Sequence, residues 1–169
     1  MRHFIIIATL ICTAVYGTSE LGSVKLANRG SDKPSGHVEA KNLYAKTYSS
    51  GSVIRDWNPI APNSHLAGGM RYEYGQLSVP QSGRYYIYTQ LYYLNNKRII
   101  VVVNHKGVDK RVAMISPPSG SPDSQGQLYT GGVFELDHGD TIQLEVQAGG
   151  ISARVWMQEF HTYFGAYMI

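Results

Sequence analysis

The segment Gly83–Leu94 constrains the fold most, because it has the composition of a β-strand with two apolar faces. Successive side chains on a strand point to opposite faces. One face then carries Tyr85, Ile87, Thr89, Leu91 and Tyr93, and the other carries Arg84, Tyr86, Tyr88, Gln90, Tyr92 and Leu94. An antiparallel strand in a lone domain usually has one buried and one hydrated face. A second sheet covers only one face, so we expect a partner on the other, most simply a second copy of the chain.

Tyrosine-rich runs bounded by Gly, Pro, Asn and Ser recur along the chain, and this pattern is typical of an all-β domain. Many short strands at even spacing predict a two-sheet sandwich or jelly roll. We expect tight turns at Lys106–Asp109 and Asp137–Asp140 and a surface loop over Ser116–Gln127. The expected strands are His37–Ala40, a piece near Trp57, Met70–Tyr72, Gln76–Val79, Gly83–Leu94, Ile99–Asn104, Lys110–Ile115, Leu128–Leu136, Thr141–Gln147, Ala153–Met157 and His161–Ile169.

The last of these strands repeats the feature of Gly83–Leu94. Phe164, Ala166 and Met168 lie on one of its faces, and Tyr163, Tyr167 and Ile169 lie on the other. Two strands with two apolar faces each are stronger evidence for an oligomer than one.

The N-terminal segment 1–17 has the features of a secretory signal: a basic start, an apolar run, and small residues before Thr18. We expect cleavage after Gly17, a flexible leader over 18–36 and a folded domain over 37–169. The apolar run is shorter than the roughly 20 residues of a spanning helix, so a type II membrane anchor is the minor alternative. The only cysteine, Cys12, lies in this segment, so the mature chain would be stabilised by its core or by oligomerisation.

No set of residues predicts an enzyme, a metal site or a cofactor. The histidines are scattered, without a second His or Cys at metal-ligand spacing. Asp137 and Asp140 favour a hairpin turn over a calcium site. The net charge of +3 is too small to indicate nucleic acid as a partner. Trp57 and Trp156 can stack on sugars, but tryptophan is more often a core or interface residue.

Four blocks of the sequence, in order, resemble the tumour necrosis factor superfamily of trimeric cytokines. They are His37-Val38 followed by Trp57, then the run from Gly75 to Gln90, then Tyr129-Thr130-Gly131-Gly132-Val133-Phe134-Glu135-Leu136 with Gly139-Asp140, and finally Tyr163-Phe164-Gly165-Ala166. The resemblance covers about residues 37–169. It implies a ten-stranded jelly roll that assembles as a homotrimer, although a hetero-trimer stays open.

The resemblance also implies which residues act. The positions that match the family's subunit interface are Tyr86, Tyr88, Tyr129, Phe134, Tyr163 and Tyr167. Loops at receptor-facing positions are Tyr44–Asp56, Leu94–Arg98 and His105–Asp109, and the receptor contacts chosen from them are Tyr48, Arg55, His105 and Val108. The implied partner is a cysteine-rich receptor of the tumour necrosis factor receptor type, bound outside the cell.

Two other classes of function remain open. One is a complement-type globular head, which is also a trimeric jelly roll but usually follows a collagen-like repeat that is absent here. The other is a carbohydrate-binding β-sandwich that uses Trp57 or Trp156 and needs no trimer.

Overall fold

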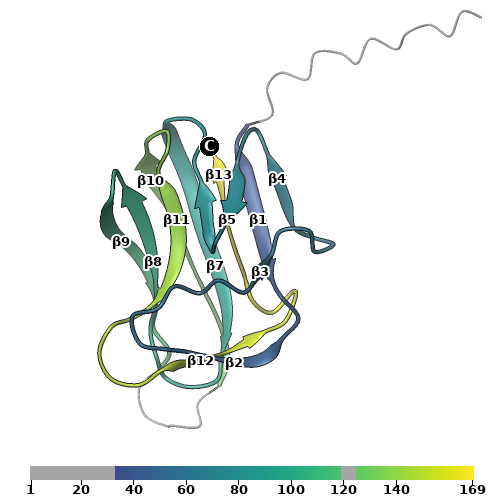
Figure 1. The fold of residues 1–169 in the computed structure, drawn as a ribbon, viewed down its shortest axis with the longest axis vertical. Helices are drawn as coiled ribbons and strands as arrows, with labels where there is room; N and C mark the ends of the chain where they lie inside the picture. Colours follow the sequence, from purple (N-terminus) through teal and green to yellow (C-terminus); the bar gives the residue numbers. More distant parts are fainter. Residues whose placement is uncertain (1–32, 119–124) are drawn as a thin grey trace, which may run out of the picture. The chain divides into compact units, whose positions relative to one another are not determined.

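The computed structural model describes residues 33–118 and 125–169, and the expected signal segment and most of the expected leader lie outside these ranges. The described chain is built from β-strands (Figure 1). They are β1 (Ser35–Ala40), β2 (Tyr44–Tyr48), β3 (Trp57–Asn58), β4 (His65–Ala67), β5 (Arg71–Glu73), β6 (Gln76–Ser78), β7 (Gly83–Tyr93), β8 (Ile99–His105), β9 (Val108–Ile115), β10 (Gly126–Leu136), β11 (Thr141–Val146), β12 (Ala153–Met157) and β13 (Tyr163–Met168).

The strands form two antiparallel sheets, which confirms the predicted all-β sandwich. One sheet joins β7 to β10 and β13, continues through β1 to β3 and β4, and includes β12 and β2. The other has the order β5-β6-β11-β8-β9 and lies in front of the first in Figure 1. No helix long and apolar enough to cross a membrane occurs in residues 33–118 or 125–169.

The core lies between the sheets and contains one face of β7. Residues Tyr85 to Tyr93 alternate strictly between buried and half-buried, as the strand period predicts. Tyr85 and Leu91 are fully buried, while the even-numbered residues point away from the core. Trp57 is also fully buried; its ring packs edge-on against Phe164 at 4.8 Å and its Nε1 donates to the Ile54 carbonyl at 2.8 Å. This burial removes Trp57 as a sugar-stacking residue.

Most expected strands occur within a few residues of their predicted bounds, but β2 and β4 were not predicted. The segment Tyr44–Tyr48 was expected to be a loop, and it forms a strand because it pairs with β12, with Ala45 opposite Trp156. Strand β4 forms by pairing with β1, where His65 lies opposite His37. Strand β1 begins at Ser35, inside the range expected for the leader.

The two expected turns are present. At Lys106 and Gly107 the backbone φ angles are 50° and 84°, which suits a tight hairpin between β8 and β9. Asp140 closes the other turn, since its N–H donates to the Asp137 carbonyl at 3.1 Å. Its carboxylate accepts from the Asp137 N–H at 2.9 Å. The segment is therefore a tight turn, but the hairpin interpretation is wrong, because β10 pairs with β7 in one sheet while β11 pairs with β6 and β8 in the other.

Candidate functional site

The outer face of β7, β10 and β13 carries a group of tyrosines that we call the tyrosine face: Tyr86, Tyr88, Tyr129, Tyr163 and Tyr167. Strand register brings them together. Tyr167 pairs with Tyr86, while Tyr163 and Tyr129 pair with Gln90 from its two sides. Paired residues of neighbouring strands point to the same face. The structure thus brings together the five tyrosines that the sequence assigned to a subunit interface.

Two glycines let the tyrosine rings lie flat against the sheet. A Cβ on Gly165 would lie 2.5 Å from the Tyr88 hydroxyl and 2.5 Å from the Gly36 carbonyl oxygen. A Cβ on Gly131 would lie 2.7 Å from the Tyr86 hydroxyl. Any larger side chain at either position would push a ring away from the sheet. The glycines of the Tyr-Phe-Gly-Ala and Gly-Gly blocks therefore shape this surface.

The tyrosines contact one another through rings and hydroxyls. The Tyr86 and Tyr167 ring centroids are 5.5 Å apart, and Tyr88 is 6.3 Å from both Tyr163 and Tyr167. These distances suit tilted and edge-to-face pairs. The hydroxyls of Tyr86 and Tyr129 are hydrogen-bonded at 3.0 Å. The tyrosines therefore form a connected aromatic layer, and some of their hydroxyls are hydrogen-bonded to other tyrosines of the layer.

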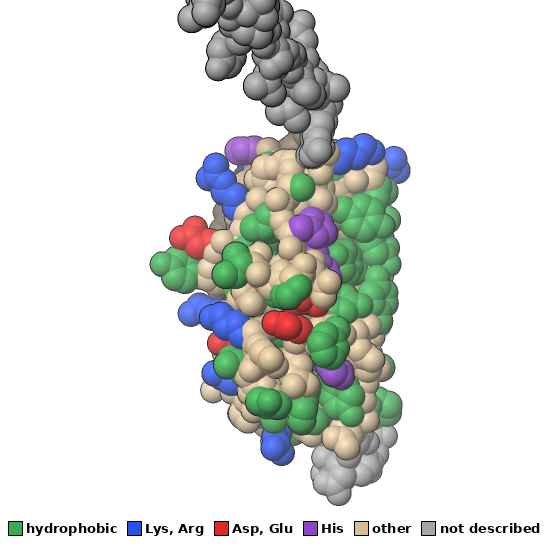
Figure 2. All heavy atoms as spheres, turned by 90° about the vertical axis from the view of Figure 1, so that its right-hand side faces the viewer, with side chains coloured by type: hydrophobic (Ala, Val, Ile, Leu, Met, Phe, Trp, Pro, Cys, Tyr) green, Lys and Arg blue, Asp and Glu red, His purple; other side chains and the backbone are tan. Residues whose placement is uncertain are grey.

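This surface is largely apolar, and the exposed Arg84 and Glu135 lie opposite each other at one end of it. Tyr129 is 53% exposed, Val133 51%, Tyr167 44% and Ile169 45%. Burial raises the pKa of Tyr88 to about 12, and its neighbours Tyr163 and Tyr167 act in the same direction, so its hydroxyl is neutral near pH 7. Figure 2 shows hydrophobic side chains in a continuous band along its right-hand edge, the side of the β7–β13 sheet. Contiguous exposed apolar surface of this kind marks an interaction site.

Two histidines, which the sequence interpretation left aside as scattered residues, extend the tyrosine face. His37 on β1 is hydrogen-bonded through Nδ1 to the Tyr88 hydroxyl at 2.8 Å. Its ring stacks on His65 at 6.1 Å with an interplanar angle of 9°. Burial lowers the pKa of His37; the nearby Glu39 opposes this shift and His65 adds to it. In strand β1 (Ser35–Ala40), His37 pairs with Gly165 of β13. This register makes it a member of the tyrosine face.

Phe134 lies on the other side of β10 from Tyr129. It pairs with the fully buried Tyr85 and packs against the core. It also lines an open cavity of about 540 Å³ between β10 and the β8–β9 hairpin, together with His105 and Lys110. Phe134 is therefore not part of the tyrosine face, and any subunit contact it makes comes from this open edge of the sandwich.

The four residues expected to contact a receptor do not form one cluster. Tyr48 is only 7% exposed and its hydroxyl donates to Asp56 Oδ2 at 3.0 Å, which also pairs with Lys46 at 3.4 Å. Its ring belongs to the core, so it is unavailable as a surface contact. The sequence predicts a loop over β2, and this expectation does not account for the burial of Tyr48 at the end of the strand.

The other three remain accessible in different places. Arg55 is exposed and follows Ile54, whose N–H donates to the Leu144 carbonyl along one edge of β11. Strand β8 lies along the other edge of β11 and ends at His105. Val108 is 61% exposed on the far side of the Lys106–Gly107 turn. His105 Nδ1 lies 2.8 Å from Asp140 Oδ1, so it also has a structural contact.

Comparison with known proteins identifies the family. The sequence profile of the TNF (Tumour Necrosis Factor) family matches residues 55–169. The chain belongs to the tumour necrosis factor family. It is 28% identical over 138 residues to the tumor necrosis factor of Rattus norvegicus, covering 71% of this chain and 56% of that protein. The tumor necrosis factor of Oryctolagus cuniculus is 29% identical over 147 residues, covering 76% and 60%.

The chain thus spans little more than half the length of the curated relatives it matches. Among solved structures, Eiger TNF from S. frugiperda superposes with a TM-score of 0.67 at 16% identity, over 81% of this chain and 93% of that chain. At this identity the superposition shows the fold alone. The tumour necrosis factor fold confirms the predicted jelly roll.

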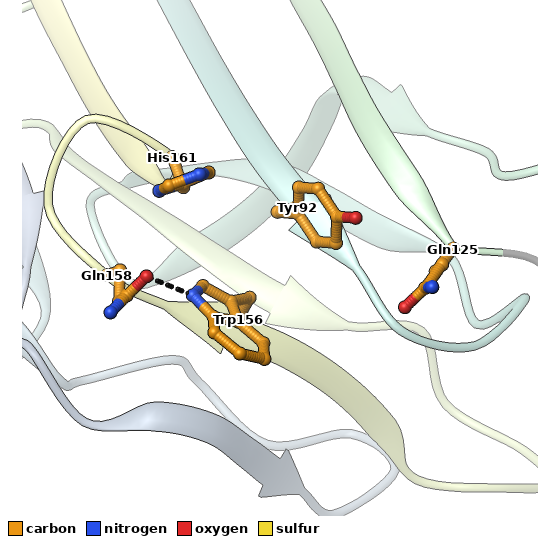
Figure 3. A pocket seen from close by; sticks show the side chains of 5 residues that line it. All are labelled: Tyr92, Gln125, Trp156, Gln158 and His161. Atoms are coloured by element: carbon orange, nitrogen blue, oxygen red, sulfur yellow. Dashed lines mark hydrogen bonds between the residues drawn. The ribbon is translucent and has the colours of Figure 1, made fainter.

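In this tumour necrosis factor domain an aromatic patch continues from the lower end of β7. Its residues form an unbroken series of ring contacts: Tyr44, Trp156, Tyr92, His161 and Phe160. Tyr44 is 61% and Phe160 66% exposed. A pocket of about 180 Å³ lies within the patch, and its lining side chains are drawn in Figure 3: Tyr92, Gln125, Trp156, Gln158 and His161. The Trp156 Nε1 donates to Gln158.

Within the described ranges, no group of three or more His, Cys, Asp or Glu side chains is arranged to hold a metal ion. The tyrosine face offers apolar area, tyrosine hydroxyls and a few directional hydrogen bonds.

Proposed function

We propose that the chain is a secreted, cytokine-like ligand that assembles as a homotrimer through the tyrosine face and binds cysteine-rich receptors of the tumour necrosis factor receptor type. The observation that carries the proposal is the outward-facing layer of five tyrosines, exposed or half-buried, on a domain of the tumour necrosis factor family. Receptor engagement by a trimer brings several receptors together, so the signal is geometric and no bond is made or broken. The expected signal segment at 1–17 supports secretion.

A cyclic trimer joins two different surfaces of the same chain, and the contacts close after three steps. The tyrosine face supplies one surface. The open edge next to Phe134 is the natural candidate for the other, because it is partly apolar and hollowed. Burial of apolar area contributes about 25 cal/mol per Å², and an aromatic side chain buries up to roughly 150–250 Å². Five tyrosines per chain therefore provide a large share of the assembly energy.

We propose that the receptor contacts Arg55, His105 and Val108. We propose the aromatic patch as a further receptor contact. Interface hot spots are enriched in tyrosine, tryptophan and arginine. The patch borders the tyrosine face, since Gln90 Nε2 donates to the Phe160 carbonyl at 3.4 Å. In a trimer it would lie beside the seam between protomers, where a receptor can touch two chains.

Native mass spectrometry of protein collected from the medium of expressing cells tests assembly and secretion together. The expected species is a trimer of chains that begin near Thr18. A monomer of that chain contradicts the tyrosine-face assignment, and full-length chain found only in the membrane fraction contradicts secretion.

Receptor binding is tested with the purified trimer against a panel of cysteine-rich receptor ectodomains displayed on cells. Val108→Asp and Arg55→Ala should weaken binding to the receptor found, while Tyr74→Ala, a change at an exposed tyrosine of the β5–β6 turn, should not. Each variant is first shown to be a trimer by light scattering. A trimer that binds no ectodomain, or full binding by the Val108 and Arg55 variants, would argue against the receptor proposal.

A carbohydrate-binding module remains the second candidate because Trp156 and Tyr92 line a small pocket with two glutamine side chains. Aromatic rings with amide groups are suited to stacking and hydrogen bonding with sugars. A glycan array that shows saturable binding lost in Trp156→Ala would favour this function. No binding across the array would remove it.

A further inference from the structure

We propose that a basic pocket between the segments 94–98 and 147–151 binds an oxyanion, namely a sulfate or phosphate group, either free or carried on a sulfated polysaccharide. The pocket is open, has a volume of about 440 Å³, and is lined by Asn96, Lys97, Arg98, Gln147, Gly149 and Gly150 among others. It shares no lining residue with the tyrosine face or the aromatic patch. The proposal therefore uses none of the residues proposed above as trimer or receptor contacts, although the segment 94–98 is one of the loops that the resemblance places toward a receptor.

Lys97 is the central observation. Its side chain is 9% exposed, and its ammonium group donates to the Gly149 carbonyl. No carboxylate in the described ranges forms an ion pair with it, because the three ion pairs found there involve Lys46 and His105. An ammonium group has three donors, and a buried cation without a counter-ion is costly. An anion in the pocket would supply the missing charge and accept the remaining hydrogen bonds.

The backbone beside Lys97 offers further donors. Gly149 and Gly150 have φ angles of 87° and 80°, a conformation that glycine adopts at little cost. Neither of their N–H groups donates to a backbone carbonyl of the described residues. Successive free N–H groups in a turn form anion-binding concavities.

Arg98 adds a second cation at the mouth of the pocket. Its Nε donates to Ser116 Oγ at 3.1 Å, which holds the side chain and leaves the other guanidinium N–H groups free to donate. A guanidinium matches two oxygens of a sulfate or phosphate group. None of the described residues that line the pocket is acidic. The local charge therefore favours an anion, although the whole chain is only weakly basic.

The pocket is also held in shape by bonds between its two segments. The Gln147 N–H donates to the Arg98 carbonyl at 3.0 Å, and Asn95 Nδ2 donates to the Ser152 carbonyl at 2.8 Å. The Arg154 N–H donates back to Asn95 Oδ1 at 3.1 Å. A site whose donors are already positioned loses less entropy when a ligand binds.

The test compares two double variants with the same change in charge. Lys97→Gln/Arg98→Gln alters the pocket, and Lys41→Gln/Arg71→Gln alters exposed basic residues outside it. The purified full chain, labelled with ¹⁵N, is titrated at constant ionic strength with sodium sulfate and, separately, with a heparin-derived hexasaccharide. The readout is the amide shift of Gly149 and Gly150, which reports the site directly.

We expect saturable shifts of both glycine amides, at least tenfold weaker affinity in the Lys97/Arg98 variant, and unchanged affinity in the Lys41/Arg71 variant. Saturation with sulfate alone assigns a free anion, and saturation only with the hexasaccharide assigns a sulfated polysaccharide; both support the pocket. Shifts that rise linearly with either probe, or equal affinity in both variants, would overturn it. If the double variant fails to fold, Arg98→Gln alone replaces it, because that side chain is exposed.

Discussion

The Tyr88 hydroxyl lies directly above the Cα of Gly165, in the space where any other residue at position 165 would place its Cβ. Gly165 therefore permits a tyrosine to lie flat on the neighbouring strand, and the flat ring shapes the surface that we propose as the subunit interface. The segments Gly165-Ala166 and Ile87-Tyr88-Thr89 therefore fit together sterically.

Gly165→Ala should destabilise the domain by about 1–3 kcal/mol, the usual cost of overpacking. The added methyl group meets the Gly36 carbonyl as well as the tyrosine, and backbone yields less readily than a side chain. Urea denaturation at one protein concentration measures the change. Gly126→Ala is the matched control, because the nearest atom to its Cβ would be the Tyr93 hydroxyl at 3.3 Å. Equal losses in the two variants would contradict the steric account.

Tyr88→Asp should yield monomer or aggregate in place of trimer, because it puts a carboxylate in the middle of an apolar interface. Light scattering after size exclusion gives the mass. Tyr74→Asp places the same charge on a 78% exposed tyrosine of the β5–β6 turn, away from the tyrosine face, and should leave the assembly intact. A stable trimer of Tyr88→Asp would remove the tyrosine face from the interface.

Stability should fall as the pH drops below about 6.5, the ordinary pKa of histidine. The folded-state pKa of His37 lies below that value, so in this range the unfolded chain binds more protons and acid favours unfolding. The stabilisation is fully present above pH 6.5 and is lost as the pH falls toward the folded pKa. Protonation would also place a charge beside His65 and under Tyr88.

Melting temperatures of wild type and His37→Gln between pH 5 and 8 measure this effect. The variant should show a flatter dependence below pH 6.5, since glutamine does not titrate and can still bond the Tyr88 hydroxyl. His138→Gln, at the exposed β10–β11 turn, is the control and should keep the wild-type slope. An unchanged slope in His37→Gln would assign the acid sensitivity to other groups.

Asp140→Ala should cost about 1–3 kcal/mol of folding free energy, because it removes the buried acceptor of the Asp137 N–H and the partner of His105. The Asp140 side chain is only 5% exposed and accepts from the Asp137 N–H while it contacts His105. Asp137→Ala, whose carboxylate is 56% exposed, should cost less than half as much. Chemical denaturation measures the loss of folding free energy in each variant. A larger loss in Asp137→Ala than in Asp140→Ala would show that the turn does not depend on Asp140.

The tyrosine face could be predicted because it follows from a local rule. Successive side chains of β7 and β13 point to opposite faces of the sheet. On β7 this places Tyr86 and Tyr88 on the face opposite Tyr85, and on β13 it places Tyr167 on the face opposite Phe164, independently of the rest of the fold. The contact of His37 with Tyr88 is different, since these residues are 51 positions apart. It depends on the register of β1 against β13, which no local pattern specifies.

Tyr48 illustrates the same limit. Strand β2 is mostly exposed, so it lacks the apolar alternation that marks a strand, and it is formed by pairing with β12. The burial of Tyr48 and its bond to Asp56 follow from that tertiary pairing. The basic pocket could not be predicted either, because Lys97 and Gly149 meet only when β8 and β11 pair.

The different burial of the two tryptophans gives the protein two built-in fluorescent reporters. Trp57, enclosed in the core against Phe164, should emit at short wavelength and respond only when the domain unfolds. Trp156, half-buried in the aromatic patch, should emit further to the red and be accessible to a quencher such as iodide. A Trp57→Phe protein would then carry a single emitter, whose spectrum reports on whatever approaches that surface.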